Sequence, residues 1–128
     1  LGFSSDYNEP TASAVFAGAD MYLMPSRFEP CGLSQMMAMR YGTVPVVRQT
    51  GGLADSVEPY NRYTGEGTGF GFLNFNAHEL LFTTQEACRL YTESPVAWGN
   101  LAAQGMAKDF SWRASALEYR KLYRGLFT

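Results

Sequence analysis

The sequence predicts an α/β fold built on a parallel sheet. Two short apolar runs, residues 21–24 and 45–47, lie on either side of a segment with helical periodicity. Strand, helix and strand within about thirty residues is the spacing of a right-handed βαβ crossover, which makes the two strands parallel. The second half of the chain instead shows long stripes of helical period, so helices follow the sheet.

The first strand of the predicted sheet follows a short helix. Residues 11–17 carry apolar side chains at helical intervals, and Pro10 stands near the first turn, where its missing N–H is not needed. The run 21–24 follows Asp20 and stops at Pro25. Its uninterrupted apolar character predicts a strand that is buried on both faces.

The helix of the crossover is predicted from an apolar stripe with a glycine after it. Gly42 is placed to cap the C-terminus of this helix, and residues 45–47 then form the second strand and lead into a loop over 48–52. The stripe consists of Leu33, Met36, Met37 and Arg40.

The second half of the chain predicts a long loop and three helices. Turn residues crowd residues 58–71, which indicates a mobile surface loop that feeds a short strand. Asn76 and Glu79 form a capping pair for a helix from residue 77, and Ser94 and Ser111 mark the starts of two more. The stripe of the first of these helices consists of Leu80, Leu81, Thr84, Ala87, Cys88 and Tyr91.

Composition excludes several classes of function. Ten Lys and Arg against twelve Asp and Glu give a formal charge of −2, which offers no attraction for nucleic acid. No apolar run approaches the ~20 residues that cross a bilayer, and no secretory leader is visible, so a soluble protein without a membrane partner is expected. Cys31 and Cys88 lack the spacing of a disulfide framework or a zinc site, which favours a reducing cytoplasm and no metal.

The segment 25–33 carries the most chemical information, because it joins the end of a strand to the start of a helix. Ligands of open parallel sheets gather at this edge, where helix N-termini offer free N–H groups to anions. Glu29 could accept hydrogen bonds from sugar hydroxyls while the amides of Gly32 to Ser34 face a phosphate. The alternative is that Glu29 is only a helix-entry carboxylate favoured by the helix dipole, and the residues alone rank that alternative first.

Six short motifs change this ranking. They are Tyr7-Asn8-Glu9, Ala17-Gly18-Ala19-Asp20, Pro25-Ser26-Arg27-Phe28-Glu29-Pro30-Cys31-Gly32-Leu33, Tyr41-Gly42-Thr43, Thr50-Gly51-Gly52-Leu53-Ala54-Asp55 and Asp109-Phe110-Ser111-Trp112. Their order and spacing strongly resemble the last quarter of bacterial glycogen synthases and the related plant starch synthases. The resemblance covers essentially the whole chain, and the string from Ser26 to Leu33 is its most specific part.

The resemblance implies a retaining transferase that moves glucose from ADP-glucose to the non-reducing end of an α-1,4-glucan, without a cofactor. In that family two Rossmann-like domains form the site in the cleft between them, the GT-B arrangement. Residues 1–75 would then be the second half of the donor domain. Residues 76–128 would be its C-terminal helical segment, which in the family packs back toward the partner domain.

The resemblance also implies roles for individual residues. Glu29 matches the family's essential carboxylate, which contacts the donor glucose and supports the charge that develops at the anomeric carbon. Cys31 and Gly32 match positions that line the glucose, and the main chain at Leu33 and Ser34 matches the donor phosphate contact. Fixed amide dipoles can meet the charge of the departing diphosphate without reorganising. The other matches are Tyr7, which would stack on adenine, and Thr50 and Gly51, which would lie close to the donor.

Two positions depart from the family pattern. Many retaining glycosyltransferases of this architecture carry a second Glu eight residues after the first, which commonly contacts the ribose, whereas this chain has Met37. Glycogen synthases of this type often lack that Glu, and Met37 is expected to pack in the core beside Leu33 and Met36. Near the start, Ser13-Ala14 stand where the family often has His-Arg.

Other candidate residues have simpler interpretations. A helix N-terminus lowers a thiol pKa, but no base accompanies Cys31, so a lining role is favoured over a nucleophile. Cys88 is expected to be buried and His78 to be a surface residue. The glycine-rich run 65–71 lacks the leading strand and the Lys of a phosphate loop. Helical spacing favours a core role over sugar stacking for five aromatic residues, Trp98, Phe110, Trp112, Tyr119 and Tyr123.

The chain alone is expected to be inactive. In the family the acceptor domain, the first strands of the donor domain and the basic residues that clamp the pyrophosphate lie upstream. An open sheet edge predicts that the isolated chain self-associates or is only marginally stable. Two alternatives remain open, a non-catalytic carbohydrate-binding or assembly module on the same fold and a relative that uses UDP-glucose.

Overall fold

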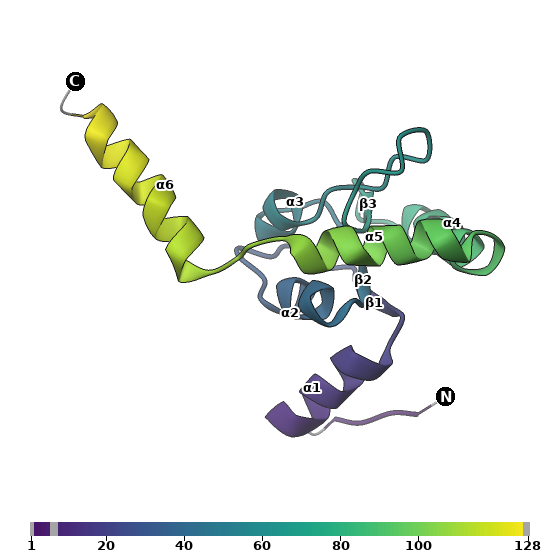
Figure 1. Ribbon diagram of the computed structural model, residues 1–128. Helices are drawn as coiled ribbons and strands as arrows, with labels where there is room; N and C mark the ends of the chain where they lie inside the picture. The colour runs from purple at the N-terminus through teal and green to yellow at the C-terminus, as the bar shows by residue number, and fades with distance from the viewer. Residues whose placement is uncertain (1, 6–7, 127–128) are drawn as a thin grey trace.

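The computed structural model, which describes residues 2–5 and 8–126, confirms the α/β prediction (Figure 1). Three parallel strands form a sheet in the order β1-β2-β3. They are β1 (Met21–Met24), β2 (Val44–Arg48) and β3 (Phe70–Phe72). The strand that the sequence placed after the glycine-rich loop is therefore the third member of the sheet.

Six helices are present in the described part of the chain, one more than the sequence predicted. They are α1 (Glu9–Gly18), α2 (Ser34–Tyr41), α3 (Gly52–Ser56), α4 (Ala77–Glu93), α5 (Pro95–Ala107) and α6 (Trp112–Gly125). The predicted caps are in place except at Ser94, which precedes α5 but makes no capping hydrogen bond with its side chain. The Asn76 side chain accepts a hydrogen bond from the backbone N–H of Glu79 at 2.9 Å, and Gly42 ends α2 with a φ of 86°. Only the short α3 was not predicted.

The core has two halves because the side chains of β2 alternate between the two faces of the sheet. Val44 and Val46 pack with Ala87 of α4 and with Trp98 and Leu101 of α5, whereas Val47 points to the opposite face. The core on that opposite face also contains Met39, Leu53 and Val57, from α2, α3 and the end of α3. All four residues from Val44 to Val47 are buried, as expected of a central strand.

Strand β1 is not buried on both faces, contrary to the prediction. Its register pairs Leu23 with Val46, which places Leu23 on the face that α4 and α5 cover elsewhere. Leu23 is nevertheless 49% exposed. Because β1 is an edge strand of this sheet, α4 and α5 leave Leu23 uncovered, although Met21 at the start of the strand packs against their core.

The buried stripe of α4 also differs from the predicted one. Its buried residues are Thr83 and Ala87, with Leu90 packed against the core. Cys88 is exposed and Leu81 is about half exposed, so both predicted core roles were wrong. The face of α4 that contacts the sheet and α5 is therefore narrower than the apolar stripe that the sequence predicted.

The C-terminal helix α6 extends away from the sheet (Figure 1). It contributes no buried residue, and Trp112 is 89% exposed. The core prediction therefore holds for Trp98 and fails for the other four aromatic residues. Those four are Phe110, Trp112, Tyr119 and Tyr123.

The loop between α3 and β3 is anchored at its base. The Gln104 carboxamide donates to the Gly65 carbonyl at 2.9 Å and accepts from the Gly67 N–H at 3.2 Å. Lys108 forms a 2.6 Å salt bridge with Glu58. The loop is exposed at its tip, as predicted, but α5 holds its two ends.

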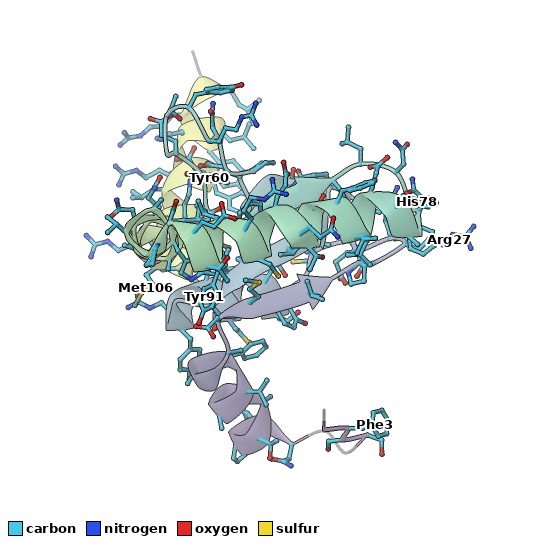
Figure 2. The ribbon with its side chains drawn as sticks, turned by 90° about the vertical axis from the view of Figure 1, so that its right-hand side faces the viewer. Phe3, Arg27, Tyr60, His78, Tyr91 and Met106 are labelled. Atoms are coloured by element: carbon cyan, nitrogen blue, oxygen red, sulfur yellow. The ribbon has the colours of Figure 1, made fainter. Side chains whose placement is uncertain are left out.

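The two ends of the sheet are seen in Figure 2. Arg27 and His78 lie at one end, and Tyr91 and Met106 at the other. His78 is exposed, as predicted. None of the described helices has the length and apolar character that a membrane span requires.

Candidate functional site

The loops that follow the three strands meet at the carboxyl edge of the sheet. Arg48, the last residue of β2, donates from Nε to the Leu73 carbonyl at 3.0 Å and from Nη1 to the Arg27 carbonyl. Its guanidinium also lies 5.8 Å from the centre of the Phe75 ring. One side chain therefore holds the loop after β1 to the loop after β3.

Glu29 lies on the first of these loops and is half-buried. It lines a cavity of about 700 Å³, within the ~300–1,000 Å³ typical of ligand pockets. Gly32, Leu33 and Ser34 line the same cavity. The remaining lining residues are Glu9, Ala12, Ser13, Phe16, Tyr22, Met24, Met37 and Tyr41. Glu29 and the start of α2 therefore border the same cavity.

The N-terminus of α2 opens this cavity to anions. Leu33 is the N-cap and its side chain makes no capping hydrogen bond. Side chains of Asn8, Asn76 and Ser111 cap α1, α4 and α6, whereas α3 and α5, like α2, have no side-chain cap. The first-turn amides of α2 therefore have no side-chain acceptor. They lie at the N-terminus of the helix, which is the positive end of its dipole. That arrangement suits a phosphate or another anionic group.

The loop after β2 packs directly against the loop that carries Glu29. The N–H of Gly52 donates to the Glu29 carbonyl at 3.0 Å. A Cβ atom on Gly51 would lie 2.0 Å from that same carbonyl oxygen, and one on Gly52 would lie 1.8 Å from the Cys31 oxygen. Gly51 also has a φ of 47°, a conformation that favours glycine. The two glycines allow the two backbones to touch.

The structure brings together only some of the predicted site residues. Glu29, Gly32, Leu33 and Ser34 share one cavity. Gly51 packs against the backbone of Glu29, and neither Gly51 nor the neighbouring Thr50 lines the cavity. Cys31 is exposed and does not line the cavity either. Tyr7 lies outside the described residues.

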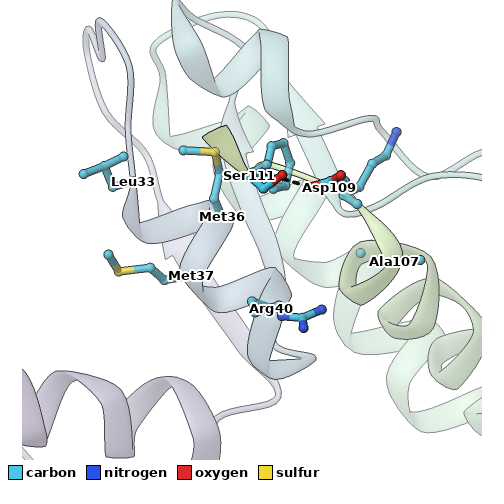
Figure 3. A pocket seen from close by; sticks show the side chains of 10 residues that line it. Leu33, Met36, Met37, Arg40, Ala107, Asp109 and Ser111 are labelled. Atoms are coloured by element: carbon cyan, nitrogen blue, oxygen red, sulfur yellow. Dashed lines mark hydrogen bonds between the residues drawn. The ribbon is translucent and has the colours of Figure 1, made fainter. Parts of the chain in front are cut away.

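Met37 was expected in the core, and that expectation was wrong. Its side chain is 50% exposed, and the residue lines both the first cavity and a second hollow of about 500 Å³. Figure 3 shows this second hollow. This second hollow separates α2 from the segment that joins α5 to α6. Arg40 donates to the Met106 carbonyl at 3.2 Å, which fixes the near end of that segment to α2. Hydrogen bonds from Ser111 hold the pKa of Asp109 below its usual value in the same segment.

Sequence reasoning missed three residues that build the site. Arg48 was taken only as the start of a loop, although a cation at the end of a buried strand is unusual enough to be noticed. Gln35 lies within the helix of the crossover and is fully buried. Ser56 ends α3, which was not predicted, and its hydroxyl contacts Gln35. The clue that the sequence offered for Gln35 was an amide side chain directly after the segment in which the site was predicted.

Known proteins resemble this chain in sequence and in structure. The chain is 55% identical over 120 residues to a glycogen synthase of Bacillus cereus (strain ZK / E33L), which covers 94% of this chain and 25% of that protein. It is 56% identical over 115 residues to a glycogen synthase of Streptococcus gordonii, which covers 90% and 24%. The chain thus spans about a quarter of the length of the curated relatives it matches.

A solved structure of a starch synthase is also similar to this chain. The catalytic domain of starch synthase IV from Arabidopsis thaliana, bound to ADP and acarbose, matches 93% of this chain with a TM-score of 0.84 and 38% identity, over 25% of its own length. The resemblance to glycogen and starch synthases is thereby confirmed, as is the GT-B type of fold. The family description "Glycosyl transferases group 1" matches residues 2–99, which is most of the chain. On this evidence the chain belongs to the glycosyl transferases group 1 family.

Proposed function

We propose that this chain forms the sugar-nucleotide side of a retaining glucosyltransferase that extends an α-1,4-glucan from ADP-glucose. One observation carries the proposal: Glu29 and the uncapped first turn of α2 line a single cavity at the carboxyl edge of the sheet. The names of the relatives, glycogen synthase and starch synthase, point to the same reaction. The ADP bound in the starch synthase structure favours an adenine nucleotide as donor.

The cavity divides the work between a carboxylate and backbone amides. Glu29 contacts the glucose and stabilises the positive charge that develops at the anomeric carbon as ADP leaves. The amides at Leu33 and Ser34 meet the negative charge of the leaving diphosphate, and they need no rearrangement because the helix already holds them. Gly32 lies beside the sugar in this cavity. Cys31, Thr50 and Gly51 lie on the adjoining loops, outside the cavity lining, and we assign them to the donor side together with Tyr7, which would stack on the adenine.

The rest of the enzyme supplies what this quarter does not contain. An N-terminal part of the enzyme closes over the cavity. It binds the acceptor glucan and carries the basic residues that clamp the pyrophosphate. The apolar side chains that α6 exposes are covered by that part, since an amphipathic helix with no buried residue requires a partner surface. The complete enzyme works in the cytoplasm, where sugar nucleotides are available.

Replacing Glu29 with alanine in the complete enzyme tests the proposal. Loss of an electrostatic stabiliser of the transition state is expected to lower kcat by about 10²–10³-fold. Binding of a maltooligosaccharide should be unchanged, because that ligand occupies the acceptor side. Glu66→Ala, which removes an exposed carboxylate from the loop between α3 and β3, is the matched control and should leave kcat unchanged.

Two results would overturn the proposal in different ways. A Glu29→Ala enzyme that still turns over at the wild-type rate would exclude the catalytic role. A wild-type protein that binds glucan yet transfers no glucose would be a carbohydrate-binding or assembly module. Titration of the wild-type enzyme with ADP-glucose and with UDP-glucose decides the donor nucleotide, with the lower KM expected for ADP-glucose.

A further inference from the structure

The carboxamide of Gln35 is the most deeply buried polar side chain next to the cavity. Gln35 lies in the first turn of α2 and is 0% exposed. Its Nε2 donates to the Gly32 carbonyl at 2.8 Å and to the Ser56 hydroxyl at 2.9 Å. It also lies 3.4 Å from the Cys31 carbonyl oxygen. One amide nitrogen therefore connects the Glu29 loop, α2 and α3.

The hydrogen bonds of Ser56 fix which way this amide faces. The Ser56 hydroxyl donates its single proton to the Gly52 carbonyl at 2.6 Å, so it can only accept from Gln35. A reversed amide would bring its oxygen against the Gly32 carbonyl oxygen and lose that bond too. The nitrogen of Gln35 must therefore point to both partners.

The oxygen of the same amide has no hydrogen-bond partner among the described residues. It faces Gly32, where a Cβ atom would lie only 2.5 Å from Oε1. The Cα hydrogen that takes the place of a side chain in Gly32 thus points at Oε1, a weak but favourable contact. The position of the amide therefore satisfies the two hydrogen bonds of its nitrogen and the close approach of Gly32, at the cost of an oxygen without a hydrogen-bond donor.

These contacts close a ring around the loop that carries Glu29. The Gly52 N–H donates to the Glu29 carbonyl at 3.0 Å, and the Gly52 carbonyl accepts from Ser56. Ser56 accepts from Gln35, and Gln35 donates to Gly32. Both ends of the segment 29–32 are therefore held by one buried network whose centre is Gln35.

We propose that Gln35 is a positioning residue, which fixes the distance between the Glu29 carboxylate and the first-turn amides of α2. The inference rests on the function proposed above, because it assigns to those two groups the sugar and the diphosphate of one donor. Gln35 itself does not line the cavity. It acts through the Glu29 loop, and its loss would separate two groups that must act on the same molecule.

Three variants of the complete enzyme test the proposal. Gln35→Met keeps the length of the side chain and removes both donated hydrogen bonds. It is expected to lower kcat by at least tenfold, because a misplacement of about 1 Å can cost about 10²-fold. Gln104→Met is the matched control, since it makes the same change at a glutamine whose amide also bonds to a loop, through the backbone of Gly65 and Gly67 after α3. It should leave kcat within twofold of wild type.

The third variant, Gln35→Glu, adds a pH-dependent readout. A buried carboxyl has a raised pKa, and when protonated it can donate one hydrogen bond to the Gly32 carbonyl. When ionised it can donate none. The ratio of Gln35→Glu to Gln35→Met activity should therefore rise as the pH falls. A ratio that stays constant with pH would contradict a role for the donated hydrogen bond.

Amide hydrogen exchange gives a readout that does not depend on catalysis. In Gln35→Met the Gly52 amide should exchange at least tenfold faster, whereas the Val44 amide, which bonds to Asp20 at the other end of the sheet, should not change. Unchanged exchange at Gly52 together with wild-type kcat would overturn the proposal. If the wild-type enzyme transfers no glucose, the proposed function fails while exchange still decides the positioning role. Should Gln35→Met not fold, Ser56→Ala opens the same ring with a smaller change, and unaltered exchange at Gly52 would again overturn it.

Discussion

Replacing Gly52 with alanine tests whether the contact between the two loops controls catalysis. The added Cβ atom would lie 1.8 Å from the Cys31 oxygen and 2.4 Å from the Cys31 carbonyl carbon. Real Cβ atoms essentially never come closer than 3.0 Å to another heavy atom, so the two backbones must separate by about 1.2 Å. Both neighbours are backbone atoms, and no side-chain rotation can relieve the overlap.

The displacement sets the size of the expected effect. A separation of about 1 Å stretches the bond from the Gly52 N–H to the Glu29 carbonyl from 3.0 Å beyond hydrogen-bonding distance. A misplacement of that size in a catalytic constellation costs about 10²-fold. We therefore expect kcat of the complete enzyme to fall by about 10²-fold, measured as release of ADP from ADP-glucose with a glucan acceptor.

Gly99→Ala is the control for this experiment. Gly99 lies within α5, and a Cβ there would meet no atom within 4 Å. Alanine in a helix interior is more favourable than glycine by about 1 kcal/mol, so this variant should melt at a slightly higher temperature with unchanged kcat. A folded Gly52→Ala enzyme with wild-type kcat would refute the reasoning, because it would show that the Glu29 loop tolerates displacement.

Three further predictions concern stability and association. Hydrogen bonds from Asn74 lower the pKa of Glu79 below 4.5, so its stabilisation of the α4 N-terminus is present above that pH and lost as the pH falls through the lowered value. Urea titrations below pH 4.5 should show this loss in wild type and not in Glu79→Gln. The hydrogen bond to Asp20, with its charge, raises the pKa of Tyr91 above 10.0, so this stabilisation is present below pH 10 and lost above it. Spectroscopic titration of Asp20→Asn should show a lower tyrosine pKa. The isolated chain should self-associate through the open edge of β1, and Leu23→Lys should shift its sedimentation toward the monomer, whereas an unchanged distribution would exclude that edge.

The order of the elements could be predicted because each has a local cause. Pro25 ends the first strand, Gly42 ends α2 with a positive φ, and Asn76 starts α4 through its side chain. These residues act on their immediate neighbours, so a single sequence contains the information. The short α3 has no such cause, because its N-cap is Gly51 and no side chain caps it.

Burial was predicted less well, because it depends on distant parts of the chain. The apolar run of β1 indicated a strand covered on both faces, but neither α4 nor α5 reaches Leu23. The apolar face of α6 indicated a core, but no described element packs on it. In both cases the apolar residues were identified correctly. An apolar pattern does not say which part of the protein covers those residues.

The site was predicted where its chemistry lies in one continuous segment. Residues 25–34 contain both the carboxylate of Glu29 and the start of α2. Because this segment directly follows a strand, both groups were predicted at the carboxyl edge of the sheet. Gln35, Ser56 and Arg48 support that segment across the fold, and Ser56 is 21 residues from the amide it accepts from. A contact of that kind follows from the packing of α2 on α3, which no local pattern encodes.

The charge of the cavity argues that this chain alone would hold the proposed donor, ADP-glucose, only weakly. Among the described residues that line it, Glu9 and Glu29 carry negative charge and none is Lys or Arg. A nucleoside diphosphate would bring further negative charge next to two carboxylates, and the helix dipole offsets only about half an elementary charge. Arg48 does not line the cavity, and two of its N–H groups bind the backbone carbonyls of Arg27 and Leu73. If the proposed function is right, cations from the rest of the enzyme complete the site, and we expect the isolated chain to bind ADP-glucose far more weakly than the complete enzyme does. Equal affinity in calorimetric titrations of the two would show that the amides of α2 suffice.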